Sequence, residues 1–122
     1  LHQAGISTDS IDLVHLHGTA TVANDATEAM GLVGLFGGVT PPAFGTKAQT
    51  GHTLGAAGVL ETIAAIAALQ RRTVPKNVAL QDTDVAAGLD LVQKPRSLAR
   101  ARHALKVASG FGGVQAALVL QA

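Results

Sequence analysis

The chain has 122 residues, the length of one ordinary domain, and 48% of them are hydrophobic, which is enough to form a core. Nine Lys and Arg residues nearly balance eight Asp and Glu residues, so the charge does not favour binding to nucleic acid. The chain has no cysteine, and any reaction that needs a thiolate must therefore take its nucleophile from elsewhere.

The first residues predict the end of a helix and then a strand. Residues 1–4 have the pattern of a last helical turn that Gly5 ends, so the chain is expected to start inside an element. They lack the charged and hydrophobic regions of a secretion signal, and a cytoplasmic location is the default expectation. Hydrophobic and branched residues alternate over 11–17, which predicts a strand with His17 at its C-terminal end, just before Gly18.

A helix and a short extended segment are expected next. Asn24 or Asp25 is predicted to cap a helix over residues 26–36. The glycines and prolines of residues 37–42 break this pattern, so a loop must follow. Residues 44–47 are a candidate for a short extended segment.

An Ala-rich helix is predicted to begin at Gly51 or Thr53 and to run to about Arg72. Its hydrophobic stretch, residues 54–69, is shorter than a bilayer span and carries Glu61 near its middle, which predicts a buried helix and no membrane segment. A buried Glu needs a partner, because an unpaired carboxylate in a core is costly. The small residues of the first turn permit close packing against a sheet or another backbone.

The segment after this helix is irregular. Residues 74–77 and 81–84 have turn chemistry, and residues 89–92 are predicted to form a short strand. Pro95 and Ser97 then interrupt the pattern.

Two final strands are predicted over residues 103–109 and 114–121, antiparallel around the Gly-rich turn 110–113. The alternation of strands and helices along the chain, with these strands at the end, indicates an α/β layered domain with a mixed sheet.

Two histidines lie in Gly-rich settings that suggest chemistry. His17 begins His-Gly-Thr-Ala-Thr, and His52 lies in Gly-His-Thr-Leu-Gly-Ala-Ala-Gly. A neutral imidazole can donate a hydrogen bond to a developing oxyanion, and small neighbours let a substrate approach the ring. Alone, His17 could be a strand-end core residue and His52 a helix cap; their context favours function. No thiolate or cluster of metal ligands accompanies them, so no metal site is expected.

Three segments, 17–21, 47–58 and 110–113, resemble the C-terminal part of beta-ketoacyl-acyl-carrier-protein synthases. That family has His-Gly-Thr-x-Thr, then a Lys followed five positions later by His, then Gly-Phe-Gly-Gly between terminal strands, and Lys47 and His52 keep this separation. The resemblance implies a thiolase-like fold, an αβαβα sandwich of two similar halves. Residues 1–122 would then be the C-terminal domain, most of the second half, as a fragment of a longer protein.

The resemblance also implies roles for the histidines and two charged residues. A Cys in the first half carries the acyl chain, and His17 and His52 stabilise the enolate formed when a malonyl thioester loses its carboxylate. Lys47 and Glu61 correspond to a charged pair that supports the histidine site. On this basis the isolated chain is expected to be inactive and to expose hydrophobic surface where the missing half would pack.

Other positions match the family less directly. Thr19 and Thr21 match residues that touch the pantetheine arm, although they could equally satisfy backbone groups of the loop. Phe111 matches the residue that gates the acyl pocket, and Asp25 and Glu28 match an acidic segment that organises the loop. The chain departs from the family where Asn24 replaces a Gly, where residues 107–109 replace Asn-Ser-Phe, and where residues 114–115 replace Thr-Asn.

The partners implied by the resemblance are acyl carrier protein and a second synthase subunit, in a homodimer or a heterodimer. No cofactor is expected besides the phosphopantetheine that acyl carrier protein carries. A late basic cluster could meet an acidic carrier protein, but a solvated basic face is the favoured interpretation; its members are Arg96, Arg100, Arg102 and Lys106. Two alternatives stay open: a non-catalytic partner like the chain-length factors and, more weakly, thiolase or polyketide condensing chemistry on the same fold.

Overall fold

A four-stranded mixed sheet forms the middle layer of the computed structural model, which describes residues 1–80 and 87–122. Its strands lie in the order β2-β1-β5-β6. Strand β1 pairs in parallel with β2 and β5, whereas β5 and β6 are antiparallel. The strands are β1 (Leu13–His15), β2 (Ala43–Phe44), β5 (His103–Ser109) and β6 (Gln115–Gln121).

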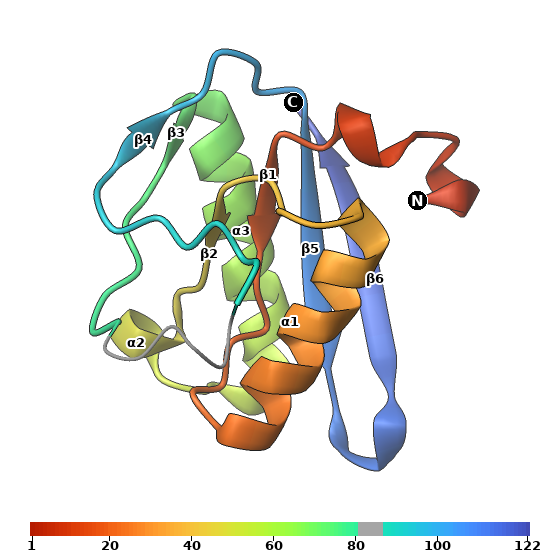
Figure 1. Ribbon diagram of the computed structural model, residues 1–122. Coiled ribbons are helices and arrows are strands. Elements are labelled where there is room, and N and C mark those ends of the chain that lie inside the picture. The colour runs from red at the N-terminus through yellow and green to blue at the C-terminus, as the bar shows by residue number, and fades with distance from the viewer. Residues whose placement is uncertain (81–86) are drawn as a thin grey trace.

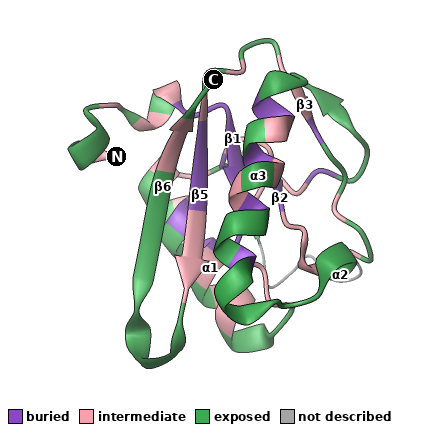
Figure 2. Cartoon of the chain, turned by 180° about the vertical axis from the view of Figure 1, so that it is seen from behind, coloured by how far each residue is buried: buried purple, intermediate pink, exposed green. Residues whose placement is uncertain are grey.

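Two long helices cover the sheet. Helix α1 (Val22–Phe36) lies on one face and helix α3 (Ala57–Gln70) lies on the other, as the views from the two sides show (Figures 1 and 2). The predicted α/β layers with a mixed sheet are confirmed.

The alternation of side chains along β1 divides the core into two parts. Leu13 packs into a cluster with Ala65 and Leu69 of α3, whereas Val14 packs into a second cluster with Leu32 of α1. Because successive residues of a strand point to opposite faces, the odd-numbered residues His15 and His17 follow Leu13 toward the side of α3.

The shorter elements connect these layers. The chain starts with a short helical turn that ends at Gly5 in the left-handed region, as predicted. Strands β3 and β4 form a separate antiparallel pair. The short elements are η1 (His2–Ala4), η2 (Thr8–Ser10), α2 (Lys47–Thr50), η3 (Leu54–Ala56), β3 (Thr73–Val74), β4 (Arg96–Ser97) and η5 (Phe111–Gly113).

The predicted cap of the first helix is wrong. Helix α1 begins at Val22, and Thr21, in an extended conformation, takes the N-cap position without a side-chain bond. Asn24 and Asp25 therefore lie inside the first turn. An acidic residue suits that place as well as the cap, because it faces the positive end of the helix dipole.

Three further predictions between residues 44 and 97 need correction. The extended segment ends at Phe44, and Lys47 begins the helical turn α2. Leu91 makes only an isolated bridge to Ala43, so residues 89–92 form no regular strand. Residues 96–97 pair with β3 although a break was expected, because Pro95 precedes the paired residues and its missing N–H removes no bond from them. The turn predicted at residues 81–84 lies outside the described residues.

Helix α3 buries only one of its faces. Its buried residues include Ala65 and Leu69, but Val59 and Ile63 on the opposite side are 64% and 58% exposed. The close packing expected at its start is not made by residues 1–80 and 87–122, since a Cβ atom added at Gly55 or Gly58 would meet nothing of theirs within 4 Å. The helix is therefore less buried than the sequence predicted.

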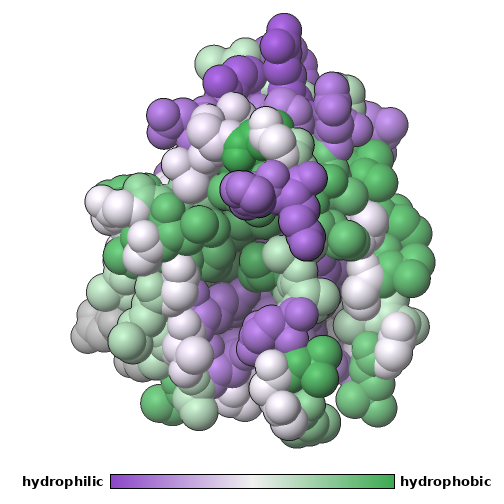
Figure 3. All heavy atoms as spheres, turned by 90° about the vertical axis from the view of Figure 1, so that its right-hand side faces the viewer, coloured by the Kyte–Doolittle hydropathy of each residue, from purple (hydrophilic) through white to green (hydrophobic). Residues whose placement is uncertain are grey.

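The expected exposed hydrophobic surface is present. Phe111, Val114 and Leu118 of the β5–β6 hairpin are exposed, together with the outer side of α3. Hydrophobic residues occupy much of the face that looks toward the β6 edge of the sheet (Figure 3). Among the helices of the described residues, none is long and hydrophobic enough to cross a membrane.

Candidate active site

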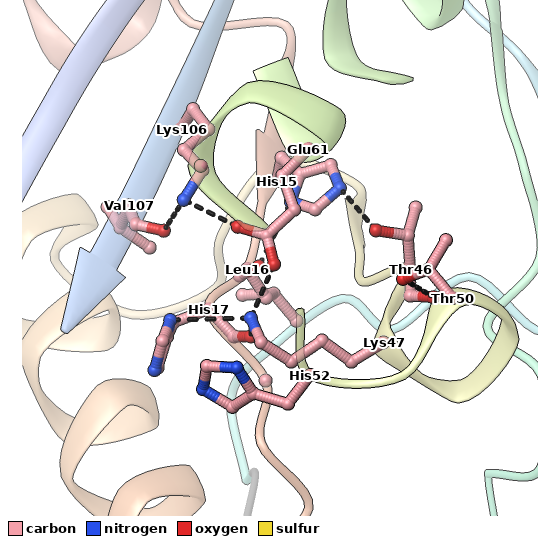
Figure 4. A network of polar contacts seen from close by, with 12 residues as sticks. His15, Leu16, His17, Thr46, Lys47, Thr50, His52, Glu61, Lys106 and Val107 are labelled. Carbon is pink, nitrogen blue, oxygen red and sulfur yellow. Dashed lines mark hydrogen bonds and ion pairs between the residues drawn. The ribbon is translucent and has the colours of Figure 1, made fainter. Parts of the chain in front are cut away.

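Polar side chains from four parts of the chain meet at the C-terminal end of β1. His17 follows β1, Lys47 begins α2, His52 follows α2, and Glu61 lies on the buried side of α3 (Figure 4). A fifth side chain, Lys106, reaches the same place from β5. The fold thus brings together all four residues that the sequence analysis placed at the centre of the site.

The two imidazoles are neighbours. The ring centroids of His17 and His52 lie 5.7 Å apart, with an angle of 84° between the ring planes. His17 is buried, with 7% of its surface exposed, whereas His52 is exposed. One ring is therefore held by the protein and the other faces outward beside it.

The contacts of both rings define the same tautomer. The Lys47 ammonium group lies 3.4 Å from Nδ1 of His17, and the backbone N–H of Leu54 donates to Nδ1 of His52 over 3.2 Å. An ammonium group and a backbone N–H can only donate, so each Nδ1 atom must accept. In the neutral rings the proton is then on Nε2, and both imidazoles have an Nε2–H group available to a ligand.

Lys47 connects the histidine site to α3. Its ammonium group donates to the backbone carbonyl of His17 and forms an ion pair with Oε1 of Glu61. Only 7% of the Lys47 side chain and 3% of the Glu61 side chain are exposed. The partner expected for the Glu of this helix is thus Lys47.

Lys106 is a second buried partner of Glu61. Its Nζ atom lies 2.6 Å from Oε2 of Glu61, and 3% of its side chain is exposed. Lys106 was expected on a solvated basic face, which is wrong for this residue. The register of β5 opposite β1 pairs Lys106 with His15, and both side chains point toward α3.

The other basic residues of that cluster stay at the surface. Arg96 is exposed and forms an ion pair with Asp90, and Arg100 forms one with the buried carboxylate of Asp12. Two of the guanidinium groups of this cluster are therefore paired with carboxylates.

The charges around His17 act on its pKa. Burial and the Lys47 ammonium group lower the pKa of His17, and Glu61 opposes this shift. Burial alone would raise the pKa of Glu61, but the ammonium groups of Lys106 and Lys47 outweigh burial and lower it. The site therefore favours a neutral His17 beside a charged Glu61.

Glu28 holds the loop that carries His17. Its carboxylate accepts hydrogen bonds from the backbone N–H groups of His17 at 2.6 Å and Gly18 at 2.9 Å. Burial raises the pKa of Glu28 although these bonds oppose the shift. The carboxylate of Asp25 accepts a bond from the Asn24 amide at 3.1 Å, within the first turn of α1. Glu28 thus binds the loop after β1, whereas Asp25 binds its neighbour within helix α1.

A pocket of about 520 Å³ opens beside His52, and His17 is not among the residues that line it. Six of the residues selected from the sequence line it: Thr19, Thr21, Asp25, Glu28, Lys47 and His52. The hydroxyl groups of Thr19 and Thr21 lie 3.0 Å apart and bond to each other. Phe111 does not line this pocket; it lies in the turn between β5 and β6 and is 99% exposed.

Two residues of the site were missed by the sequence analysis. Lys106 was expected at the surface, and His15 was given no role beyond its place in the strand predicted over residues 11–17. His15 is fully buried, stacks edge-on against Phe44 and lies 3.4 Å from the hydroxyl group of Thr46. The alternation of β1, which places His15 on the same side as His17, was the signal that could have found it.

The fold is that of an α/β domain in which two imidazoles lie side by side at the end of β1. Residues 1–81 match the family described as Beta-ketoacyl synthase, C-terminal domain. The chain belongs to this family.

Similar proteins are known by sequence and by structure. The chain is 35% identical, over 98% of its length, to 3-oxoacyl-acyl-carrier-protein synthase 2 of Coxiella burnetii and to a putative polyketide beta-ketoacyl synthase 1 of Streptomyces cyaneus. It matches the structure of the ishigamide ketosynthase/chain length factor with a TM-score of 0.92 and 34% identity over 99% of its length. The chain spans 30%, 29% and 30% of the lengths of these three proteins.

Proposed function

We propose that this chain is the C-terminal part of a beta-ketoacyl synthase in which His17 and His52 promote decarboxylative condensation. The observation that carries the proposal is the pair of adjacent imidazoles, each with Nδ1 occupied by a donor and Nε2–H available. Two such donors suit one oxyanion, because they can bind the same developing charge without being protonated themselves.

The reaction proceeds in two steps. The bond between Cα and the carboxylate of a malonyl thioester breaks, carbon dioxide leaves, and the electron pair passes through Cα to the thioester oxygen. Nε2–H of His17 and Nε2–H of His52 donate to this enolate oxygen. Cα then attacks the acyl carbon of an acyl-cysteine; a carbon–carbon bond forms, the carbon–sulfur bond breaks, and the cysteine leaves as a thiolate. Since this chain has no cysteine, that nucleophile belongs to another part of the protein.

The remaining site residues support the imidazoles and the substrate. Lys47, paired with Glu61, fixes the tautomer and the backbone of His17. Glu28 holds the loop after β1, and Asp25 holds the first turn of α1. Thr19 and Thr21 line the pocket, where they would contact the pantetheine arm, and Phe111 would gate the acyl pocket.

Partners and location follow from this function. The substrates arrive as thioesters of acyl carrier protein, whose phosphopantetheine is the only prosthetic group the proposed reaction uses. A homodimer or a heterodimer of synthase subunits in the cytoplasm is the expected assembly. The isolated chain, which carries only one of the two groups of reacting residues, is expected to be inactive.

The test uses the parent synthase, meaning the intact protein in which this chain occurs. His17→Ala and His52→Ala are compared with His2→Ala, which changes an exposed histidine of the first turn. Release of carbon dioxide from a malonyl thioester is measured at saturating substrate. Each site variant is expected to lose about 10²–10³-fold in rate, as for removal of one oxyanion donor. An unchanged rate in either would overturn the proposal.

A second candidate is a non-catalytic partner that shapes the product cavity. The similar solved structure is titled ketosynthase/chain length factor, and residues 107–109 depart from the family pattern. The retained His17 and His52 favour the catalytic function. Intact mass of the parent after incubation with an acyl-carrier-protein thioester separates the two: a gain of one acyl group that prior thiol alkylation abolishes supports the synthase. No gain, with binding to another synthase subunit, supports the partner.

A further inference from the structure

Glu61 is shared by two buried lysines that reach it from different elements. Oε1 of the carboxylate contacts the ammonium group of Lys47, and Oε2 lies 2.6 Å from that of Lys106. All three side chains are at least 93% buried. One carboxylate and two ammonium groups carry a net charge of +1. Lys47 brings this charge to the side of the His17 ring, with Glu61 and Lys106 beyond it (Figure 4).

We propose that Lys106 is a positioning residue of the condensation site. It balances the charge of Glu61, so that the charge of Lys47 remains available to the two imidazoles and to the enolate bound between them. This inference rests on the proposed function. Lys106 itself takes no part in the proposed decarboxylation and condensation steps.

The contacts of the two lysines support separate roles for them. Of the two lysines, Lys47 contacts His17, at Nδ1 and at the backbone carbonyl, whereas Lys106 binds Glu61 and donates to the Val107 carbonyl at 2.8 Å. Without Lys106, Glu61 and Lys47 would form a neutral pair, and the field of Lys47 at the substrate would be largely cancelled. With Lys106 present, the carboxylate still fixes the position of Lys47 but no longer cancels its charge.

The other charged groups near His17 do not replace this contribution. Glu61 of α3 favours protonation of His17, while Lys47 of α2, Lys106 of β5 and the neighbouring His52 oppose it. From α1, Glu28 faces the backbone N–H of His17. From β1, the buried His15 lies beside Glu61 (Figure 4), and burial lowers its pKa to about 4, so that it adds no charge at neutral pH.

The test changes the charge in two ways in the parent synthase. Lys106→Met removes one positive charge and leaves Glu61 and Lys47 as a neutral pair. The double variant Glu61→Gln with Lys106→Met removes both a negative and a positive charge, so the net charge of +1 returns. Lys94→Met is the matched control, since it removes the charge of an exposed lysine. Lys106→Gln repeats the comparison should the methionine variant not fold.

Two measurements are made on each variant. The pKa of His17 is followed by NMR of histidine labelled with ¹³C at Cε1, and kcat and KM are measured for release of carbon dioxide from a malonyl thioester. In Lys106→Met the pKa of His17 is expected to rise and kcat to fall about tenfold, with a smaller change in KM. The double variant is expected to lie closer to the parent than the single variant in both measurements.

A purely structural role for Lys106 predicts the opposite, because truncating a second buried partner should add damage. An unchanged titration of His17 in Lys106→Met, or a double variant further from the parent than the single one, overturns the inference. The NMR measurement does not depend on catalysis. Failure of the proposed function is seen separately, as decarboxylation that persists in His17→Ala.

Discussion

His15 is a buried imidazole two residues before His17, and it connects the two segments that carry the site. Its Nδ1 atom lies 3.0 Å from the carbonyl of Leu16, and its Nε2 atom lies 3.4 Å from the hydroxyl group of Thr46. A carbonyl can only accept, so Nδ1 carries the proton and Nε2 accepts from Thr46. Leu16 precedes His17 and Thr46 precedes Lys47, so a neutral His15 fixes the start of both segments.

The stability of the fold should therefore depend on pH below neutrality. Burial lowers the pKa of His15 to about 4, whereas the unfolded chain titrates near 6.5. As the pH falls from about 6.5 to about 4, His15 binds a proton in the unfolded chain but stays neutral in the folded chain. The free energy of unfolding should fall by up to about 3 kcal/mol over this range and stay constant above it, as far as this group is concerned.

Urea unfolding of the parent synthase between pH 4 and pH 8 measures this effect. His15→Asn keeps a donor for the Leu16 carbonyl but cannot be protonated, so its free energy of unfolding should fall less steeply with pH than that of the parent. His2→Asn, at an exposed position, is the control and should keep the slope of the parent. Equal slopes for His15→Asn and the parent would show that His15 does not titrate in this way.

At the scale of elements, Asn77 joins β2 to the segment around Val92. Its amide donates to the carbonyls of Ala43 and Val92, at 2.9 and 3.2 Å, and its Oδ1 atom accepts from the N–H of Gly45 at 2.9 Å. Strand β2 has only two residues, so this side chain takes over bonds that a longer ladder would make.

Substitution of Asn77 should be costly. Asn77→Ala removes three side-chain hydrogen bonds and leaves the N–H of Gly45 without its acceptor, whereas the carbonyls of Ala43 and Val92 keep backbone donors. It should lower the free energy of unfolding by about 1–3 kcal/mol. Asn77→Asp should cost more, because a carboxylate would face the carbonyls of Ala43 and Val92. The neighbouring exposed Lys76, changed to Ala, should have little effect. Chemical denaturation of the parent synthase checks the order; an Asp variant as stable as the Ala variant would contradict it.

The strands, helices and glycine turns were predictable where one pattern dominated. Alternation over 11–17 located β1, the Ala-rich run located α3, and the glycines at 110–113 located the final hairpin. Short pieces such as β4 were missed, since a two-residue pairing depends on contact with a distant segment and leaves no periodic pattern.

Some residues of the site could likewise be predicted from sequence motifs, whereas others depend on contacts between distant segments. Lys47, His52 and Glu61 were implied by the resemblance to the synthase family, and the fold brings them together with His17. Lys106 did not follow, because residues on both faces of β5 are buried. Ala104 and Leu105 are each almost fully covered, so the pattern of polar and hydrophobic residues does not show which face is exposed. Only the register opposite β1 decides that Lys106 points toward Glu61.

At the scale of the molecule, the chain exposes more surface than its mass requires. Its accessible surface is 7033 Å², against roughly 6,100 Å² for a typical folded monomer of 12.3 kDa. The extra area includes the outer side of α3, where Val59 and Ile63 lie one turn apart, and the hairpin with Phe111. Such a surface indicates a face that packs against further protein.

Removing hydrophobic side chains from the outer side of α3 should therefore favour the isolated chain as a monomer but destabilise the parent synthase. Ile63→Gln, with or without Val59→Gln, removes hydrophobic side chains from the outer side of α3. In the isolated 122-residue chain it should increase the monomer fraction measured by size exclusion with light scattering, because less hydrophobic surface is left to associate. In the parent synthase it should lower Tm, because a buried Ile would be replaced by an amide without partners. Gln70→Ala, at an exposed polar position of α3, should change neither. A parent whose Tm is unaffected would show that this side of α3 faces solvent there as well.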